Sequence, residues 1–157
     1  MRNKKSPEIK SRGIPSSLYD RIVKNMPIPT VEALIIRNSS LLFLRRNNSP
    51  AKGQWWFPGG RIRKGESLED TLFRSVREET GLEVARHKLL TAYSRVFPER
   101  HDIAIVFLCE CRGEVITLDS QHSEYRFFRK VPKNIHSYLK QTIRDSNWTV
   151  WQTLVQE

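Results

Sequence analysis

Cysteine and long apolar stretches are scarce in this sequence, and each scarcity argues against a class of protein. The 157 residues include only two cysteines, Cys109 and Cys111, two positions apart in a strand-like run. Strand geometry puts them on one face with their Cα atoms at the far edge of bridging range, so we expect free thiols, as in a reducing cytoplasm. No segment is long and apolar enough to cross a membrane. The charged N-terminus lacks the apolar core of a secretory signal, so we expect a cytoplasmic protein without a membrane partner.

Acidic residues are also in deficit, with 17 Asp and Glu against 27 Lys and Arg and a net charge of +10. Such an excess fits nucleic-acid binding, and it equally fits steering of an anionic nucleotide substrate into a cleft. Aromatic and basic residues do not alternate as in an RNA-binding sheet, so we do not expect nucleic acid as a partner. Basic residues are frequent near the start, which predicts a flexible basic tail over residues 1–14. Residues 15–157 then suit a single domain.

The most informative segment runs from Gly59 to Leu82 and reads GGRIRKGESLEDTLFRSVREETGL. Ser67 and Asp70 have the spacing of a helix capping box. Apolar residues follow every four positions, and Gly81 suits a left-handed helix end. These signals predict a helix over residues 67–80, with an apolar stripe made of Leu68, Leu72 and Val76.

Glu78 and Glu79 form the chemical centre of this segment. Adjacent carboxylates on a half-buried helix repel each other, and a divalent cation would relieve that repulsion. Oxygen ligands with room for water suit Mg²⁺ and leave Mn²⁺ as an alternative. Judged on the pair alone, a solvated acidic helix face explains the sequence equally well. The glycine pair Gly59-Gly60, together with Glu66 and Arg74 at fixed offsets, favours the metal site.

This pattern resembles the Nudix box, G-x5-E-x7-R-E-U-x-E-E-x-G-U, in which U is a bulky aliphatic residue. The matching positions are Gly60, Glu66, Arg74, Val76, Glu78, Glu79, Gly81 and Leu82. Ser75 departs from the box, because the family has a metal-binding glutamate there, so we expect fewer or differently held metal ions. The resemblance implies an α/β fold, a Nudix-type α/β/α sandwich with a mixed sheet and a strand–loop–helix active site.

Two further segments, residues 46–61 and 119–126, look like the GDP-mannose mannosyl hydrolase branch of that family. In this branch water attacks the sugar carbon, and GDP and the sugar are released. The resemblance implies a homodimer and a nucleotide-sugar substrate. It assigns the metal shell to Gly59, Gly60, Glu79 and Gln121. It also assigns the general base to His122 and the neutralisation of the departing diphosphate to Arg46 and Arg61. These residue types suit the chemistry, since arginine forks bind phosphate and imidazole titrates near neutrality.

Two other functions stay open at this level. A conventional Nudix pyrophosphohydrolase would direct water at phosphorus, and Glu78 would then be catalytic. A non-catalytic nucleotide- or RNA-binding module is the other reading, because Ser75 weakens the box and the tail is basic.

The rest of the chain predicts strands, turns and two more helices. We expect a short helix from Ser16 or Ser17 that ends before Pro27. Strands are predicted at residues 31–36, 41–44, 89–96, 103–111 and 125–128, a long loop at 45–60, and a helix at 134–145. The aromatic segment 148–151 packs on the body or against a second subunit.

Overall fold

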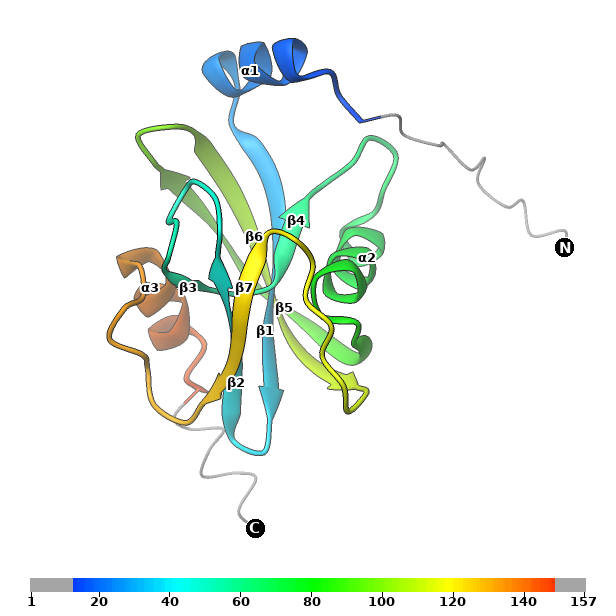
Figure 1. Ribbon diagram of the computed structural model, residues 1–157, viewed down its shortest axis with the longest axis vertical. Helices are drawn as coiled ribbons and strands as arrows, with labels where there is room; N and C mark the ends of the chain where they lie inside the picture. Colours follow the sequence, from blue (N-terminus) through cyan, green and yellow to red (C-terminus); the bar gives the residue numbers. More distant parts are fainter. Residues whose placement is uncertain (1–12, 149–157) are drawn as a thin grey trace, which may run out of the picture.

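A computed structural model describes residues 13–148 and contains three helices and seven strands (Figure 1). The order is α1 (Ser16–Asn25), β1 (Ile28–Arg37), β2 (Ser40–Arg46), β3 (Trp55–Trp56), β4 (Gly59–Arg61), α2 (Leu68–Thr80), β5 (Glu83–Val96), β6 (His101–Arg112), β7 (His122–Phe128) and α3 (Ser137–Asp145). Most of the predicted tail 1–14, and the aromatic segment beyond Trp148, lie outside the described residues.

The strands form one mixed sheet with the order β3-β2-β1-β6-β5, to which β4 is added on β1 and β7 on β2. β1 and β6 run parallel, and the other pairs are antiparallel. Helices α2 and α3 lie on opposite sides of the strands in Figure 1. The predicted α/β sandwich is therefore confirmed.

Each side of the sheet has its own hydrophobic core, because successive strand residues point to opposite faces. On the α2 side, Leu72 and Val76 pack against Val31, Ala33 and Ile35 of β1. On the other side, the apolar stripe of α3 packs with Leu34, Phe43, Trp55 and Trp56. Trp148 is also buried in that second core, so the first residue of the aromatic segment packs on the body.

Helix α2 begins and ends where the local signals predict. The Ser67 side chain accepts a hydrogen bond from the Asp70 backbone N–H at 3.0 Å, and the Asp70 side chain accepts one from the Ser67 N–H at 3.0 Å. Gly81 ends the helix with φ of 73°, a left-handed conformation that glycine adopts without strain. The helix is consequently positioned by its own sequence before tertiary packing is considered.

Other boundaries differ from the prediction. The expected long loop 45–60 contains the end of β2, the short strand β3 and the start of β4. These short segments are strands because their backbones pair with strands that lie far away in the sequence. Trp55 and Trp56 pair with β2, and Gly59 pairs with Glu32 of β1. β5 and β6 are longer than predicted because they pair along nearly their whole length. α3 starts at Ser137 instead of residue 134, with the His136 side chain as its cap.

Two expected absences concern the described part of the chain. No helix within residues 13–148 is long and apolar enough to cross a membrane. Both cysteines are free thiols, as the strand spacing predicts.

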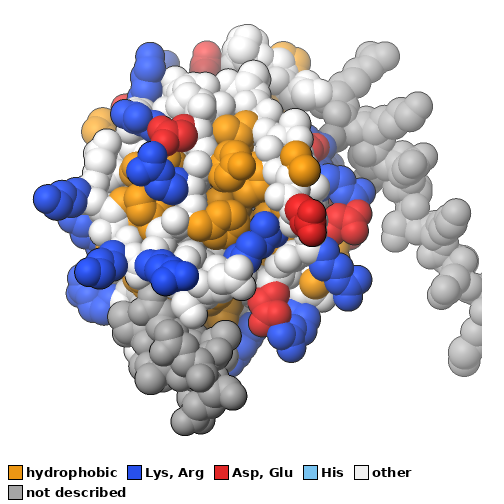
Figure 2. Space-filling view, turned by 60° about the horizontal axis from the view of Figure 1, so that its bottom comes forward, with side chains coloured by type: hydrophobic (Ala, Val, Ile, Leu, Met, Phe, Trp, Pro, Cys, Tyr) orange, Lys and Arg blue, Asp and Glu red, His pale blue; other side chains and the backbone are white. Residues whose placement is uncertain are grey.

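Lys and Arg side chains surround an exposed apolar area on the face shown in Figure 2, so basic charge is present beyond the N-terminal tail.

Candidate active site

A pocket of about 290 Å³ opens between β1, β4, α2 and the loop that precedes β7. Arginines from five separate positions line it, namely Arg46, Arg61, Arg63, Arg74 and Arg100. Carboxylates of Glu32, Glu78, Glu79, Asp102 and Asp119 line it as well. The arrangement suits a ligand that carries both phosphate charge and polar groups.

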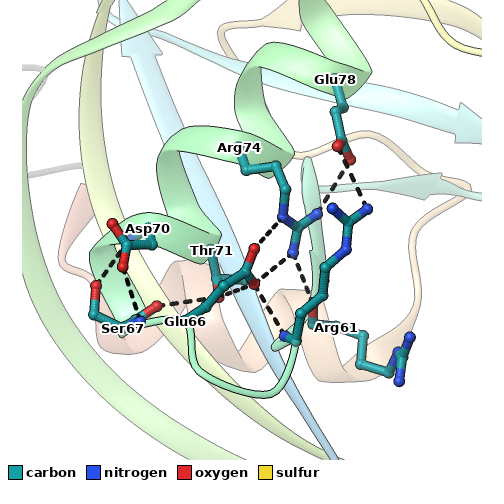
Figure 3. Close-up of polar contacts among 8 residues, drawn as sticks. Arg61, Glu66, Ser67, Asp70, Thr71, Arg74 and Glu78 are labelled. Atoms are coloured by element: carbon teal, nitrogen blue, oxygen red, sulfur yellow. Dashed lines mark hydrogen bonds and ion pairs between the residues drawn. The ribbon is translucent and has the colours of Figure 1, made fainter. Parts of the chain in front are cut away.

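Glu66 and Arg74 clamp the loop before α2 onto the helix (Figure 3). Arg74 donates to Glu66 from Nε at 2.6 Å and from Nη2 at 2.9 Å, and Nη2 also donates to the Arg61 carbonyl at 3.0 Å. The second Glu66 oxygen further accepts from the Thr71 hydroxyl and the Arg63 backbone. These two residues of the box therefore hold the loop against the helix.

The acid sensitivity of folding should depend on this clamp. Hydrogen bonds from Arg74 lower the pKa of Glu66 from 4.5 to about 2. Because the pKa of Glu66 is lower in the folded state, its ionised carboxylate stabilises the fold when the pH is above the ordinary pKa of 4.5. That stability is lost as the pH falls toward 2. We expect Glu66→Gln to reduce the free energy of unfolding at neutral pH by about 1–2 kcal/mol, discounted for solvent screening. Urea unfolding should show this difference shrinking below pH 4, whereas the exposed Glu83→Gln should change little. An equal loss at pH 7 and at pH 2.5 would contradict the prediction.

Glu79 sits at the inner side of α2 and contacts the glycine turn. Its carboxylate accepts a hydrogen bond from the Gly59 N–H at 2.9 Å. Burial, together with the nearby charge of Asp119, raises the pKa of Glu79 to about 8. The hydrogen bond from Gly59 and the charge of Arg46 oppose this rise only in part.

Asp119 and His122 complete a cluster with Glu79. One ligand atom from each of the three lies within 4.8 Å of the others. His122 Nδ1 and Asp119 Oδ1 are 2.7 Å apart. The two carboxylates beside an imidazole fit a divalent metal ion, and their oxygen donors favour Mg²⁺ or Mn²⁺. The residues present therefore fit the metal that the Nudix resemblance implies.

Asp119 was not among the predicted site residues. Its signal was available, because it stands three positions before His122 in a segment already singled out. Predicted ligand Gln121 lines the pocket, but its amide contacts Asp119 and Asn48. Among the carboxylates of residues 13–148, Glu78 is not part of the cluster of Glu79, Asp119 and His122.

The glycine turn packs tightly against its surroundings. A Cβ on Gly59 would collide with the Val31 carbonyl oxygen, and one on Gly60 would lie 2.6 Å from the Ser75 hydroxyl. Ser75 is buried beneath Gly60, and its Oγ has no hydrogen-bond partner among the described residues. The position of the missing box glutamate thus provides no charge to the site.

Glu78 points to a different set of partners from Glu79. It is half exposed and pairs with Arg74 at 3.1 Å and with Arg63 at 3.4 Å. In Figure 3 its carboxylate faces the Arg74 guanidinium. The adjacent glutamates Glu78 and Glu79 therefore have different surroundings: Glu79 lies beside Asp119, and Glu78 lies beside arginines.

The predicted phosphate-binding arginines both line the pocket, and each is partly held by protein groups. Arg46 donates from Nε to the Pro50 carbonyl at 2.7 Å and lies over the Trp56 ring. Burial lowers the pKa of Arg46, and the charge of Arg100 contributes. Arg61 lies over the ring of Tyr19, 5.5 Å from its centroid.

His122 is more enclosed than a base on an open surface. Its side chain is 3% exposed, and β7 pairs with β2 so that His122 stands opposite Arg46. Burial lowers the pKa of His122, while its contact with Asp119 opposes that change. The imidazole is consequently neutral near pH 7, which leaves it able to accept a proton.

Comparison with known proteins places these residues in context. A family model described as NUDIX domain matches residues 26–145. A low-salt glycan biosynthesis protein of Haloferax volcanii is 29% identical over 135 residues, which cover 81% of this chain and 86% of that protein. An ADP-ribose pyrophosphatase of Methanocaldococcus jannaschii is 34% identical over 104 residues, 65% of this chain and 62% of that protein. A solved MutT NUDIX hydrolase from Burkholderia pseudomallei has the same fold, with a TM-score of 0.72, 22% identity, and coverage of 77% of this chain and 98% of that one.

Proposed function

The chain belongs to the NUDIX domain family, and from that premise we propose that it hydrolyses a GDP-sugar, foremost GDP-mannose, with a divalent metal ion. Water attacks the anomeric carbon, the bond between that carbon and the phosphate oxygen breaks, and GDP leaves with the electron pair. Hydrolase activity of the Nudix type follows from the family. The sugar nucleotide and the site of attack are the proposal.

One observation carries this proposal. The metal-fitting cluster combines a single box glutamate, Glu79, with Asp119 and His122 from the loop before β7. Ser75 contributes no charge, and Glu78 pairs with arginines. A site with one box carboxylate suits a reaction in which the metal steadies a leaving diphosphate, since attack at phosphorus commonly draws on more than one metal ion.

The chain's own residues have separable roles in this reaction. Arg46 and Arg61 hold the diphosphate and stabilise the charge that develops on it. Asp119 orients the His122 ring through Nδ1, which leaves Nε2 to accept the proton of the attacking water. Glu79 and Asp119, with Gly59 or Gly60 as a backbone ligand, would hold the metal ion, which would supply Lewis acidity at the departing phosphate. The glycan biosynthesis relative supports a sugar-linked substrate.

Phosphorus NMR of GDP-mannose hydrolysis in part-¹⁸O water tests the proposal. Attack at carbon gives GDP without ¹⁸O and free mannose. Labelled GMP or mannose 1-phosphate would show attack at phosphorus and overturn the proposed chemistry.

A pyrophosphohydrolase is the second candidate, supported by the relative named ADP-ribose pyrophosphatase. It would act on a nucleoside diphosphate derivative such as ADP-ribose and release a nucleoside monophosphate. The same NMR experiment with ADP-ribose distinguishes it.

A non-catalytic binding module would instead show steeply salt-dependent RNA binding without hydrolysis of either nucleotide. The implied homodimer stays a prediction, for which sedimentation analysis is the measurement.

Glu78→Gln separates the two enzymatic candidates. Under attack at carbon, we expect kcat to change by less than about 3-fold, because the lost partners are half-exposed ion pairs. Under attack at phosphorus, loss of a metal-linked carboxylate should lower kcat by about 100-fold or more. Steady-state kinetics on both nucleotides decides, with the exposed Glu69→Gln on the same helix as the matched control.

A further inference from the structure

Asp102 and Arg100 form a polar corner of the pocket that the proposed reaction does not use. They flank the start of β6, and both line the pocket. Arg100 donates from Nη2 to Asp102 Oδ2 at 2.8 Å. The Asp102 side chain is 9% exposed, so this carboxylate is almost fully removed from solvent.

Each member of this pair keeps one buried polar atom without a partner among residues 13–148. These atoms are Asp102 Oδ1, an acceptor, and Arg100 Nε, a donor. A buried polar group left unpaired costs free energy, so such atoms in a pocket are typically completed by a ligand or by water. The ion pair therefore leaves one acceptor and one donor open.

A hydroxyl group can donate and accept, so its chemistry suits both of these atoms. It can accept from Arg100 Nε and donate its proton to Asp102 Oδ1, whereas a phosphate oxygen would be repelled by the carboxylate. A second free acceptor, Glu32 Oε2, lines the same pocket, while the other oxygen of Glu32 is held by Arg95 and by the Trp56 indole N–H. Neighbouring hydroxyls of a sugar, which both donate and accept, match the two open acceptors of Asp102 and Glu32 and the open donor of Arg100.

A nucleobase fits the corner less well, because the nearby aromatic ring is already covered. The Trp56 ring has the Arg46 and Arg95 guanidinium groups over it, each 5.9 Å from its centroid. The rings of Phe97 and His136 also pack against it. Base recognition draws on a free aromatic face for stacking, and Trp56 is engaged by the protein itself.

We propose that Asp102, positioned by Arg100, binds a sugar hydroxyl of the substrate and determines specificity for hydroxylated sugars at this corner. This assignment rests on the proposed function for the presence of a sugar nucleotide, and it adds a residue outside the Nudix box and outside the metal cluster. The hydroxyl comes either from the terminal sugar or from the nucleoside ribose, and the two sources give different binding results.

Equilibrium binding tests the assignment without turnover. Dissociation constants of GDP-mannose, GDP and ADP-ribose are measured by calorimetry with Ca²⁺ in place of Mg²⁺, for wild type, Asp102→Asn and Glu110→Gln. Glu110 is an exposed carboxylate of the same strand and serves as the matched control. Loss of a charge-assisted hydrogen bond should weaken binding of the sugar nucleotide by about 10-fold or more in Asp102→Asn only. An unchanged GDP affinity then identifies the terminal sugar, and an equal loss for GDP identifies the ribose.

A second measurement varies the ligand first on the wild-type protein, so its main result does not depend on how the variant folds. GDP-mannose analogues that each lack one hydroxyl, together with 2′-deoxy-GDP, are compared with their parents. At least one analogue should bind about 10-fold more weakly, and the folded Asp102→Asn protein should lose that discrimination. Unchanged affinity for every analogue, or for the parent in folded Asp102→Asn, would overturn the assignment and leave water as the partner of Oδ1. Wild-type protein that binds none of the parent nucleotides would overturn the proposed function itself, a result distinct from a loss confined to the variant.

Discussion

Glu79→Gln is expected to lower kcat by about 1000-fold, the largest effect of any single substitution in the site. The Glu79 carboxylate lies within 4.8 Å of ligand atoms of Asp119 and His122, and glutamine keeps its shape while removing its charge. Binding of the metal should fall with it, because carboxylate anions hold hard cations. Steady-state kinetics and Mn²⁺ binding followed by electron paramagnetic resonance provide the measurement. The exposed Glu83→Gln is the matched control, and wild-type turnover in Glu79→Gln would remove Glu79 from the metal site.

The same substitution should stabilise the metal-free protein at alkaline pH. Burial raises the pKa of Glu79 to about 8, above its value of 4.5 in model compounds. Between those two values the folded state retains a proton that the unfolded state releases, so stability falls as the pH rises through this window. In chelator at pH 8.5, the free energy of unfolding of Glu79→Gln should therefore exceed that of wild type by on the order of 3 kcal/mol, after allowance for partial exposure. The variant should accordingly have the higher melting temperature. At pH 4.5 the difference should vanish, and added Mg²⁺ should raise the melting temperature of wild type alone.

His122→Gln is expected to have the next largest effect, a fall in kcat of about 100-fold with KM changed only a few-fold. The reason is that glutamine cannot accept the proton of the attacking water, while the contacts to the nucleotide are provided by other residues. The variant His87→Gln, an exposed histidine on β5, is the control for a general effect of losing imidazole. An unchanged kcat would show that His122 is not the base.

The pH dependence of the same reaction provides an independent test of His122. Burial lowers the pKa of this imidazole from 6.5, and Asp119 partly offsets the effect of burial. A base is active when deprotonated, so kcat should decline only below pH 6.5. Asp119→Asn removes the offset and should move this acid limb to still lower pH. A limb that stays in place in Asp119→Asn would show that another group controls it.

Local sequence signals predicted helix α2 with its cap, its apolar stripe and its glycine end, because each of these depends on residues within one turn of the chain. The strands of the hairpin β1–β2 were placed correctly for the same reason, with a short polar turn between two apolar runs. The sequence predicts a loop at β3 and β4, because segments of two or three residues are too short to show a periodic pattern. These segments are strands only because they pair with β2 and β1.

The site shows the same division between local and long-range information. The box spacing alone indicates a metal site on α2, and only the resemblance to one branch separates Glu79 from Glu78 in the sequence. The fold gives the two carboxylates different partners: Glu79 contacts the Gly59 backbone, and Glu78 contacts Arg74. The sequence does not predict Asp119 as a site residue, because it reaches the site only when the loop before β7 lies beside α2. This residue and Glu79 are forty positions apart in the sequence.

The sequence by itself determined the family, the α/β class, helix α2 and the residue types suited to phosphate and metal, because these depend on local spacing and chemical identity. The tertiary structure decided which carboxylates meet and which polar atoms are left unpaired. It joined Glu79 to Asp119 and His122, buried Ser75 beneath Gly60, and left Asp102 with a free oxygen in the pocket. Those outcomes depend on strand register and on burial, which join residues far apart in the chain and which no local pattern encodes.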